Sequence, residues 1–399
     1  MGASGFLPKS AGKEITAMEK KPRWMYVGAW STNQTGGIGI YQYDEDSGTA
    51  TLCKVIREDL VAGFMVAYPE RNLLYVIDEQ MHNPELGKNA GGGGRVFAFR
   101  MNRENGDLEE INHRSAFGPL PAYISDDGTG EGLVLCCHND DHTTTRVARD
   151  IFGKYVLERV FSDTAIVHYP FTDNGALGEP DDIMVMPSAP DRYACIHSMN
   201  LAPDRRTFIA CDRNLDQVHK ITFERKTGFC RKATLQLPRG DSMKTGACPR
   251  YSAFHPTLPV VYVNSEYGRD LYLVRYDGSG LTLSAAVDAT PEGAEPGSFA
   301  PSDLIVSADG AYLYMLYRKI NVVCAFSLSA ETGEPMMIQT LQLGGQDPRG
   351  MRFSPDGRFL LVAERNSGDV ATLAIADDGT LSISSVCTGQ QMPGNIVFM

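Results

Sequence analysis

Short apolar runs alternate with polar turns along almost the whole chain, and a two-strand unit recurs among them. One copy reads CPRYSAFHPTLPVVYVNSE, over residues 248–266, and another reads DPRGMRFSPDGRFLLVAER, over residues 347–365. Each begins with Pro-Arg before an apolar run, makes a tight turn containing Pro, and resumes with a second apolar run that ends at a charged residue. Runs of this length, rich in Val, Tyr, Phe and Leu and bounded by Pro and Gly turns, predict β-hairpins.

The same unit recurs with variation through the rest of the chain. The other copies read AGFMVAYPERNLLYVIDE, LPAYISDDGTGEGLVLCCH, HSMNLAPDRRTFIACDR and PSDLIVSADGAYLYMLYR. A third run follows each copy, for example RDLYLVRYD or GDVATLAIA, and several have a fourth after a Gly turn, for example GSGLTLSAAV. The spacing of about 45 to 60 residues, with one longer unit, is typical of four-stranded propeller blades. No segment shows a sustained helical period with caps, so we expect neither an all-α nor an α/β fold.

The two ends of the chain complete this pattern. WMYVGAWS and GIGIYQYDEDSGTATL near the beginning form a partial unit without its first strand, and GNIVFM at the end is a lone strand preceded by Pro393. Pairing this last strand with the first unit closes a ring and removes open sheet edges, which would otherwise invite aggregation. We therefore predict an all-β fold: a single seven-bladed β-propeller over residues 24–399, closed by pairing of the C-terminal strand with the first blade. Residues 1–23 are predicted to be a mobile tail.

Composition narrows the kinds of partner. The 399 residues include 37 basic and 49 acidic side chains, a net charge of −12, which argues against binding nucleic acid or an anionic membrane. No apolar run approaches the roughly 18 to 20 residues that cross a bilayer, and the first residues lack the apolar stretch of a secretory signal. Nine scattered cysteines include no CxxC pair, so no zinc knuckle or thioredoxin motif is present. We expect a cytoplasmic protein, and composition leaves its oligomeric state open.

Charged and polar residues recur where the strands of each predicted hairpin begin and end. The innermost strand of a propeller blade lines the central channel, so residues at its start converge on the axis from several blades. At that start lie Tyr123, His197, Ser198, Arg250, Tyr251, Asp303 and Arg349; at the exit of the second strand lie Glu79, His138, Arg213, Glu266, Arg318 and Arg365. Several arginines in one cavity require carboxylates or an anionic ligand, and a histidine there can exchange a proton near neutral pH. The pattern indicates acid–base chemistry on a small molecule that bears an oxyanion.

The units HSMNLAPDRRTFIACDR, PRYSAFHPTLPVVYVNSE, SADGAYLYMLYR and PRGMRFSPDGRFLLVAE resemble the lactonase family of seven-bladed propellers. That family includes propeller-type 6-phosphogluconolactonases and fungal carboxy-muconate lactonizing enzymes, and the resemblance extends from about residue 25 onward. It implies catalytic roles for His197, Glu266, Arg250 and Arg318. In a lactonase, His197 or Glu266 would be the general base for attack of water on the ring ester, and the arginines would hold the oxyanion and an anionic substituent. The resemblance implies no cofactor and no metal.

Further residues define the expected substrate pocket. The candidates for substrate binding are Arg349, Tyr251, Tyr123, Glu79, Asp303 and Ser198. Tyr251 and Tyr123 stand where family members commonly have histidines, so the preferred lactone can differ from 6-phosphogluconolactone and can contain a flat, aromatic-derived ring. We expect an enzyme that hydrolyses or forms a small anionic lactone. The alternatives are a muconate-type cycloisomerase and a non-catalytic propeller that binds a ligand or a protein.

Two further features bear on metal binding and on access to the channel. A metal-dependent, gluconolactonase-type propeller would need axial oxygen ligands, for which Glu79, Asn264 and Asp303 are candidates. An insertion over residues 138–163 contains the stretch HNDDH, whose two histidines would share a metal only on a helix. The threonines that follow are poor helix formers. We expect this insertion to cap the mouth of the channel.

Overall fold

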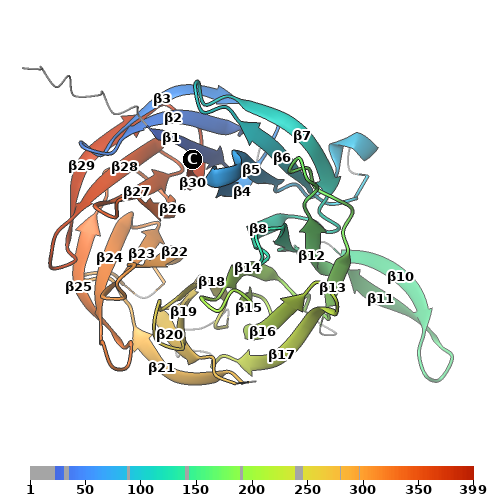
Figure 1. The fold of residues 1–399 in the computed structure, drawn as a ribbon. Helices are drawn as coiled ribbons and strands as arrows, with labels where there is room; N and C mark the ends of the chain where they lie inside the picture. Colours follow the sequence, from blue (N-terminus) through green and yellow to red (C-terminus); the bar gives the residue numbers. More distant parts are fainter. Residues whose placement is uncertain are drawn as a thin grey trace, which may run out of the picture.

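The computed structural model describes residues 23–30, 36–87, 90–139, 143–188, 192–238, 246–278, 280–295 and 297–399. Seven four-stranded antiparallel sheets surround a central axis as the blades of a propeller (Figure 1), which confirms the predicted fold class. Two 3-10 turns, η1 (Pro69–Arg71) and η2 (Pro84–Leu86), are the helical elements of the described ranges, and neither could span a membrane. The predicted mobile tail lies outside the described residues except for Arg23, which begins the first strand.

Blades are numbered in chain order, and the strands of each blade are given from the axis outward. Blade 1 contains β30 (Pro393–Phe398), β1 (Arg23–Ala29), β2 (Ile38–Asp44) and β3 (Thr49–Ile56). Blade 2 contains β4 (Ala62–Tyr68), β5 (Leu73–Asp78), β6 (Arg95–Met101) and β7 (Leu108–Ser115). Blade 3 contains β8 (Pro121–Asp126), β9 (Gly132–Cys137), β12 (Thr164–Pro170) and β13 (Asp182–Met186).

The remaining blades are continuous in sequence. Blade 4 contains β14 (Ile196–Leu201), β15 (Thr207–Asp212), β16 (Gln217–Glu224) and β17 (Gly228–Gln236). Blade 5 contains β18 (Pro249–Phe254), β19 (Val260–Ser265), β20 (Asp270–Arg275) and β21 (Thr282–Asp288). Blade 6 contains β22 (Ala300–Val306), β23 (Tyr312–Arg318), β24 (Val322–Leu328) and β25 (Pro335–Gln342). Blade 7 contains β26 (Pro348–Phe353), β27 (Phe359–Glu364), β28 (Asp369–Ile375) and β29 (Leu381–Thr388).

The ring closes through the last strand of the chain. β30 pairs antiparallel with β1, with Met25 opposite Phe398 and Val27 opposite Ile396, so both ends of the chain build blade 1. The inner strands β26 and β30 approach so closely that a Cβ on Gly350 would stand 2.0 Å from a backbone oxygen of Gly394. The predicted closure by the C-terminal strand is therefore confirmed.

Buried tyrosines connect neighbouring blades at equivalent places. In each case the tyrosine hydroxyl on a second strand donates to the carbonyl of a glycine in the outer turn of the next blade, at 2.6 to 3.0 Å; the pairs are Tyr26–Gly106, Tyr75–Gly175, Tyr262–Gly333 and Tyr314–Gly379. The four glycines have φ between 72° and 85°, a conformation that glycine adopts without a steric cost. Because a buried hydroxyl needs a partner, this repeated contact helps to fix the distance between adjacent blades.

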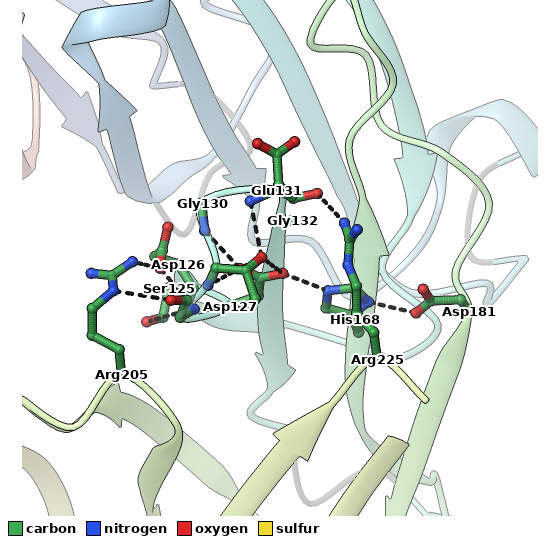
Figure 2. A network of polar contacts seen from close by, with 12 residues as sticks. Ser125, Asp126, Asp127, Gly130, Glu131, Gly132, His168, Asp181, Arg205 and Arg225 are labelled. Carbon is green, nitrogen blue, oxygen red and sulfur yellow. Dashed lines mark hydrogen bonds and ion pairs between the residues drawn. The ribbon is translucent and has the colours of Figure 1, made fainter. Parts of the chain in front are cut away.

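A polar network stabilises one end of blade 3. His168 on β12 is fully buried and contacts two carboxylates, Asp127 through Nε2 at 3.1 Å and Asp181 through Nδ1 (Figure 2). Asp127 also accepts hydrogen bonds from backbone amides of the β8–β9 turn. Arg205 of blade 4 donates to the carboxylate of Asp126, so the network joins two blades. The turn lies at the opposite end of β9 from the residues described below as the site.

A two-stranded hairpin, called the arm below, lies outside the seven blades. Its strands are β10 (Thr143–Arg149) and β11 (Tyr155–Phe161), and it projects outward from blade 3, away from the axis (Figure 1). The prediction that the insertion caps the channel mouth is therefore wrong for this hairpin. Seven consecutive residue pairs make it a continuous ladder. Residues 140–142 of the HNDDH stretch lie outside the described residues, and so does any metal site that would need His142.

Candidate active site

Two positions in each blade bring side chains to one end of the axis. The first is the second residue of each inner strand: Gly63, Ala122, His197, Arg250, Pro301, Arg349 and Gly394. The ladder register shifts at this point, for example between Pro249 and Ser252 and between Pro348 and Gly350, and such bulges change the direction of a side chain. The second position ends or directly follows the next strand: Trp30, Glu79, His138, Arg213, Glu266, Arg318 and Arg365.

Glu266 is held by arginines from three blades. Nη2 of Arg318 donates to Oε1 at 2.9 Å, Nη1 of Arg213 donates to Oε2 at 3.0 Å, and Nε of Arg250 lies 3.4 Å from Oε1. Burial alone would raise the pKa of this carboxyl, but the three arginines outweigh burial and hold the pKa of Glu266 well below its usual range. Three positive charges share one carboxylate, so an anionic ligand would complement the cluster. We call these four residues the arginine clamp.

Two histidines lie beside the arginine clamp. The ring centroids of His138 and His197 are 4.9 Å apart, and the ring of Tyr251 lies 5.1 Å from that of His197. Burial and the charge of Arg250 lower the pKa of His197 well below its usual value. Burial and Arg213 lower the pKa of His138 to about 3. Both imidazoles are therefore neutral at pH 7, and Nδ1 of His197 has no hydrogen-bond partner within the described part of the chain.

Glu79 occupies the side of the axis opposite the arginine clamp. Its carboxylate lies over Gly63, where a Cβ would stand 2.1 Å from Oε2, so only glycine leaves room for it. Burial raises the pKa of Glu79 to about 7, and the nearby Arg349 and a hydrogen bond from Trp30 offset this only in part. The guanidinium of Arg349 packs 4.1 Å above the Trp30 ring, and burial with neighbouring arginines lowers its pKa to about 9. A carboxyl that titrates near neutrality thus lies beside a cation.

A small cavity lies on the axis between these groups. Its volume is about 20 Å³, enough for one water-sized molecule, and its polar lining comes from Glu79, His197, Tyr251, Asp303, Arg349 and Asn395. Burial raises the pKa of Asp303 to about 6, although its carboxylate accepts hydrogen bonds from two backbone amides. The cavity therefore combines two carboxyls of raised pKa, a neutral imidazole and a guanidinium.

Aromatic side chains lie one residue further along three of the inner strands. The ring centroids of Phe64 and Tyr123 are 4.2 Å apart, and those of Tyr123 and Tyr251 are 5.9 Å apart. Burial raises the pKa of Tyr251 to about 12, so its hydroxyl stays protonated at neutral pH. Phe64 and Tyr251 line the cavity and Tyr123 packs against both, so these three rings form an aromatic floor of the site.

The structure brings most of the predicted residues together, with one exception. His197, Glu266, Arg250 and Arg318 meet at or beside the arginine clamp; Glu79, Arg349, Tyr251 and Asp303 line the cavity, and Tyr123 belongs to its floor. Ser198 does not reach the cavity, because its side chain is fully buried beside the thiol of Cys211.

Three further residues belong to the site. The sequence placed Arg213 and His138 at the exit position of their blades but assigned neither of them a catalytic or binding role. Trp30 takes the same position in blade 1, where the partial unit that begins the chain obscures the repeat. The position within the repeat is thus the signal that finds all three.

The metal-dependent alternative would need Glu79, Asn264 and Asp303 to meet at one point. Within the described ranges, no group of three or more His, Cys, Asp or Glu side chains is placed to hold a metal ion. Asn264, a candidate ligand, instead uses its amide inside blade 5, where it accepts from the Tyr251 amide at 2.9 Å and donates to the Ser302 carbonyl at 3.3 Å. The cavity that Glu79 and Asp303 line contains another amide oxygen, that of Asn395, and this oxygen accepts a hydrogen bond from the Met65 amide.

Fold and site together define a seven-bladed propeller with an arginine-rich acid–base site on its axis. The family described as "Lactonase, 7-bladed beta-propeller" matches residues 24–398. The chain belongs to this lactonase family, which confirms the resemblance found in its repeats.

Several relatives of known name are similar to this chain over most of its length. The 6-phosphogluconolactonase of Formosa agariphila is 25% identical over 353 residues, which cover 87% of this chain and 90% of that protein. The 6-phosphogluconolactonase of Erwinia tasmaniensis is 23% identical over 357 residues, which cover 90% of each. The periplasmic gluconolactonase of Pseudomonas aeruginosa has the same fold, with a TM-score of 0.76 at 20% identity, covering 94% of this chain and 99% of that one. By family the protein is a lactone hydrolase, as predicted, and the cycloisomerase and non-catalytic alternatives gain no support from these relatives.

Proposed function

We propose that this protein hydrolyses a small anionic lactone at the arginine-rich end of its axis. The observation that carries the proposal is the arginine clamp, in which three guanidinium groups share the single carboxylate of Glu266. The side chains of Arg213 and Arg318 are 20% and 14% exposed, whereas that of Arg250 is 1% exposed. Arg213 and Arg318 are therefore the members that a substrate can reach, and their planar groups suit two-point contact with a phosphate or carboxylate.

In this proposal Glu79 activates the attacking water. The cavity beside its carboxylate is of the right size for one water, and a base that titrates near neutrality is matched to proton abstraction at physiological pH. Glu266, one of the two bases expected from the sequence, has a different role, because a carboxylate whose pKa is held so low takes up a proton poorly. We assign Glu266 to positioning the arginines. His197, the other expected base, is assigned to the ring oxygen that leaves, to which its neutral imidazole can donate a hydrogen bond.

The reaction needs only these side chains and water. Glu79 takes a proton as the water oxygen attacks the lactone carbonyl carbon, and the negative charge that develops on the carbonyl oxygen lies next to Arg349, which lines the same cavity. The bond from the carbonyl carbon to the ring oxygen then breaks, and the proton held by Glu79 passes to that oxygen. The product is an open-chain hydroxy acid, and Glu79 returns to its ionised state.

We also propose a cytoplasmic location. All nine cysteines are free, and six of them are buried, as suits a reducing compartment. The periplasmic gluconolactonase of Pseudomonas aeruginosa shares the fold, so the fold does not decide the compartment. Fractionation of the cells that make the protein, followed by immunodetection, tests this location.

The function is tested with purified protein and a panel of lactones at constant pH, with acid release followed by titration. The panel contains 6-phosphogluconolactone, gluconolactone and a neutral lactone that lacks hydroxyl groups. We expect ring opening above the spontaneous rate, with the lowest KM for the phosphorylated lactone and strong inhibition by inorganic phosphate. A folded protein that accelerates none of these reactions would refute the proposal, and a preference for the neutral lactone would refute the role of the arginine clamp.

A further inference from the structure

The arm carries an unusual concentration of exposed apolar side chains. The described residues include fifteen large exposed apolar side chains, and seven of these lie on the arm or its turn: Val147, Ile151, Phe152, Tyr155, Val156, Leu157 and Val160. Ile151 and Phe152, in the turn at the tip, are 92% and 80% exposed. An isolated two-stranded hairpin is marginally stable at best in water, so a stable arm needs a surface to pack against.

One face of the arm is the more apolar. Val147 pairs with Leu157, and Arg149 pairs with Tyr155, so these four side chains share a face. The exposed fractions of Val147, Leu157 and Tyr155 are 66%, 77% and 72%. The opposite face carries the ion pair of Arg146 with Glu158. The arm therefore presents an apolar strip that ends in an apolar tip.

A groove lies at the base of the same arm. It has a volume of about 590 Å³ and runs between β11 and the outer strand of blade 3, with Leu157, Val160 and Val185 among its apolar lining and Asp163 on its wall. Val185 on β13 is itself 53% exposed. One chain thus has an apolar tip at one end of the arm and an apolar groove at the other end.

The charges on the arm complement the rest of the chain. Residues 143–161 contain four basic and two acidic side chains, whereas the whole chain contains 37 basic and 49 acidic. The tip is flanked by Arg149 and Lys154, whereas the charges of the groove lining are balanced, with Arg146 and Arg159 beside Glu158 and Asp163. The basic arm is therefore attracted to the negative charge of a second copy as a whole, and apolar contact rather than charge would seat the tip in the groove; the same negative charge would repel an anionic membrane.

From these observations we propose that the arm joins two copies of this chain, with the tip of each arm in the groove of the other. Six residue steps separate Tyr155 at the tip from Phe161 at the base, a distance of about 20 Å. Two arms that lie side by side in opposite directions would place each tip at the other's base. This is a twofold, self-complementary contact, the commonest arrangement in soluble homodimers. It covers Ile151 and Phe152 together with the groove residues Leu157 and Val185.

The first test is the molar mass of the protein in solution, measured by light scattering after size exclusion over a wide range of concentration. We expect the wild type to have twice the mass of one chain, and the double variant Ile151→Ser, Phe152→Ser to have the mass of one. Met336→Ser is the matched control, because Met336 is 65% exposed on an outer strand of blade 6, and it should remain a dimer. A monomeric wild type, or a double variant that stays dimeric, would overturn the proposal.

The second test distinguishes the proposed arrangement from other contacts. Phe152→Cys and Val185→Cys are combined in a chain whose exposed Cys53 and Cys230 are changed to serine. Mild oxidation should link two copies only when both new cysteines are present, because each tip faces a groove rather than the other tip. Cross-linking by Phe152→Cys alone would overturn this geometry. A wild type that is monomeric and binds phosphatidylserine vesicles through Phe152 would show that the arm's partner is a membrane instead.

Discussion

Nη2 of Arg318 in blade 6 donates to Oε1 of Glu266 in blade 5 at 2.9 Å, although the two residues are 52 positions apart in the sequence. Each residue occupies the exit position of its own blade, so their contact is a product of the propeller's rotation from blade to blade. The same carboxylate also contacts Arg213 of blade 4 and Arg250 of blade 5. Glu266 is thus the centre of a charge cluster that depends on the correct spacing of three blades.

Replacement of Glu266 by glutamine should destabilise the fold and weaken catalysis together. Three arginines would lose their shared counter-charge, and loss of one partner of a buried ion pair costs about 3 kcal/mol or more. Urea unfolding measures the change, and added inorganic phosphate should restore more stability to the variant than to the wild type. Glu331→Gln, at an exposed turn, is the control. An unchanged unfolding free energy for Glu266→Gln would contradict the role given to the clamp.

The rate of lactone opening should depend on the ionisation of Glu79. Because the pKa of this carboxyl is raised to about 7, the basic form gains population as the pH rises through that value. We therefore expect kcat/KM for a neutral lactone, corrected for spontaneous hydrolysis, to rise between about pH 6 and 8 and then level off. In Glu79→Gln this rise should disappear with most of the activity. A variant that keeps the same pH profile would exclude Glu79 as the base.

The glycine beneath Glu79 should be needed for activity but not for folding. A Cβ at Gly63 would stand 2.1 Å from Oε2 of Glu79, so Gly63→Ala should displace the carboxylate and lower kcat by about 100-fold. Gly344→Ala is the control, because nothing lies within 4 Å of the Cβ position there. Circular dichroism should show a folded propeller for both variants. Full activity of Gly63→Ala would indicate that the position of the carboxylate is unimportant.

Arg213 should distinguish charged from neutral lactones. It is the most exposed member of the arginine clamp, and a hydrogen bond to a charged group contributes about 1.5–3 kcal/mol. Arg213→Ala should therefore raise KM for a phosphorylated lactone by about tenfold or more and change KM for a neutral lactone much less. Arg206→Ala, on the exposed surface of the same blade, serves as the control. An equal effect on both lactones would assign Arg213 to structure alone.

The network around His168 should contribute stability without touching catalysis. In His168→Leu the fully buried carboxylate of Asp127 would lose its histidine partner, which should cost about 2 kcal/mol or more in urea unfolding. Turnover at saturating lactone should stay unchanged, because the network lies at the far end of blade 3 from Glu79 and His197. The partly exposed His113, changed to leucine, is the matched comparison. Equal stability of the two variants would show that the network is dispensable.

Much of the fold could be predicted because each blade repeats the same local pattern of strand and turn residues. Tyr262 in VVYV and Tyr314 in YLYM occupy equivalent strand positions, and both donate to a glycine of the next blade. The outer strands β13 and β25 were less evident, because exposed outer strands carry a weaker apolar pattern than buried ones. The direction of the arm could not be predicted, since it depends on where the insertion leaves blade 3 and on what it packs against.

The sequence by itself determined which residues share a position in the repeat, because strand and turn patterns are local and recur in every blade. His197, Arg250 and Arg349 could therefore be placed at one end of the axis before any distance was known. Only the tertiary structure decided which of the site's ionisable groups are charged near neutral pH. Glu266 and Glu79 occupy the same position in different blades, yet one is surrounded by three arginines and the other is buried with little compensation. The pKa of a carboxyl depends on charges and solvent within a few ångströms, and in this protein most of those neighbours come from other blades.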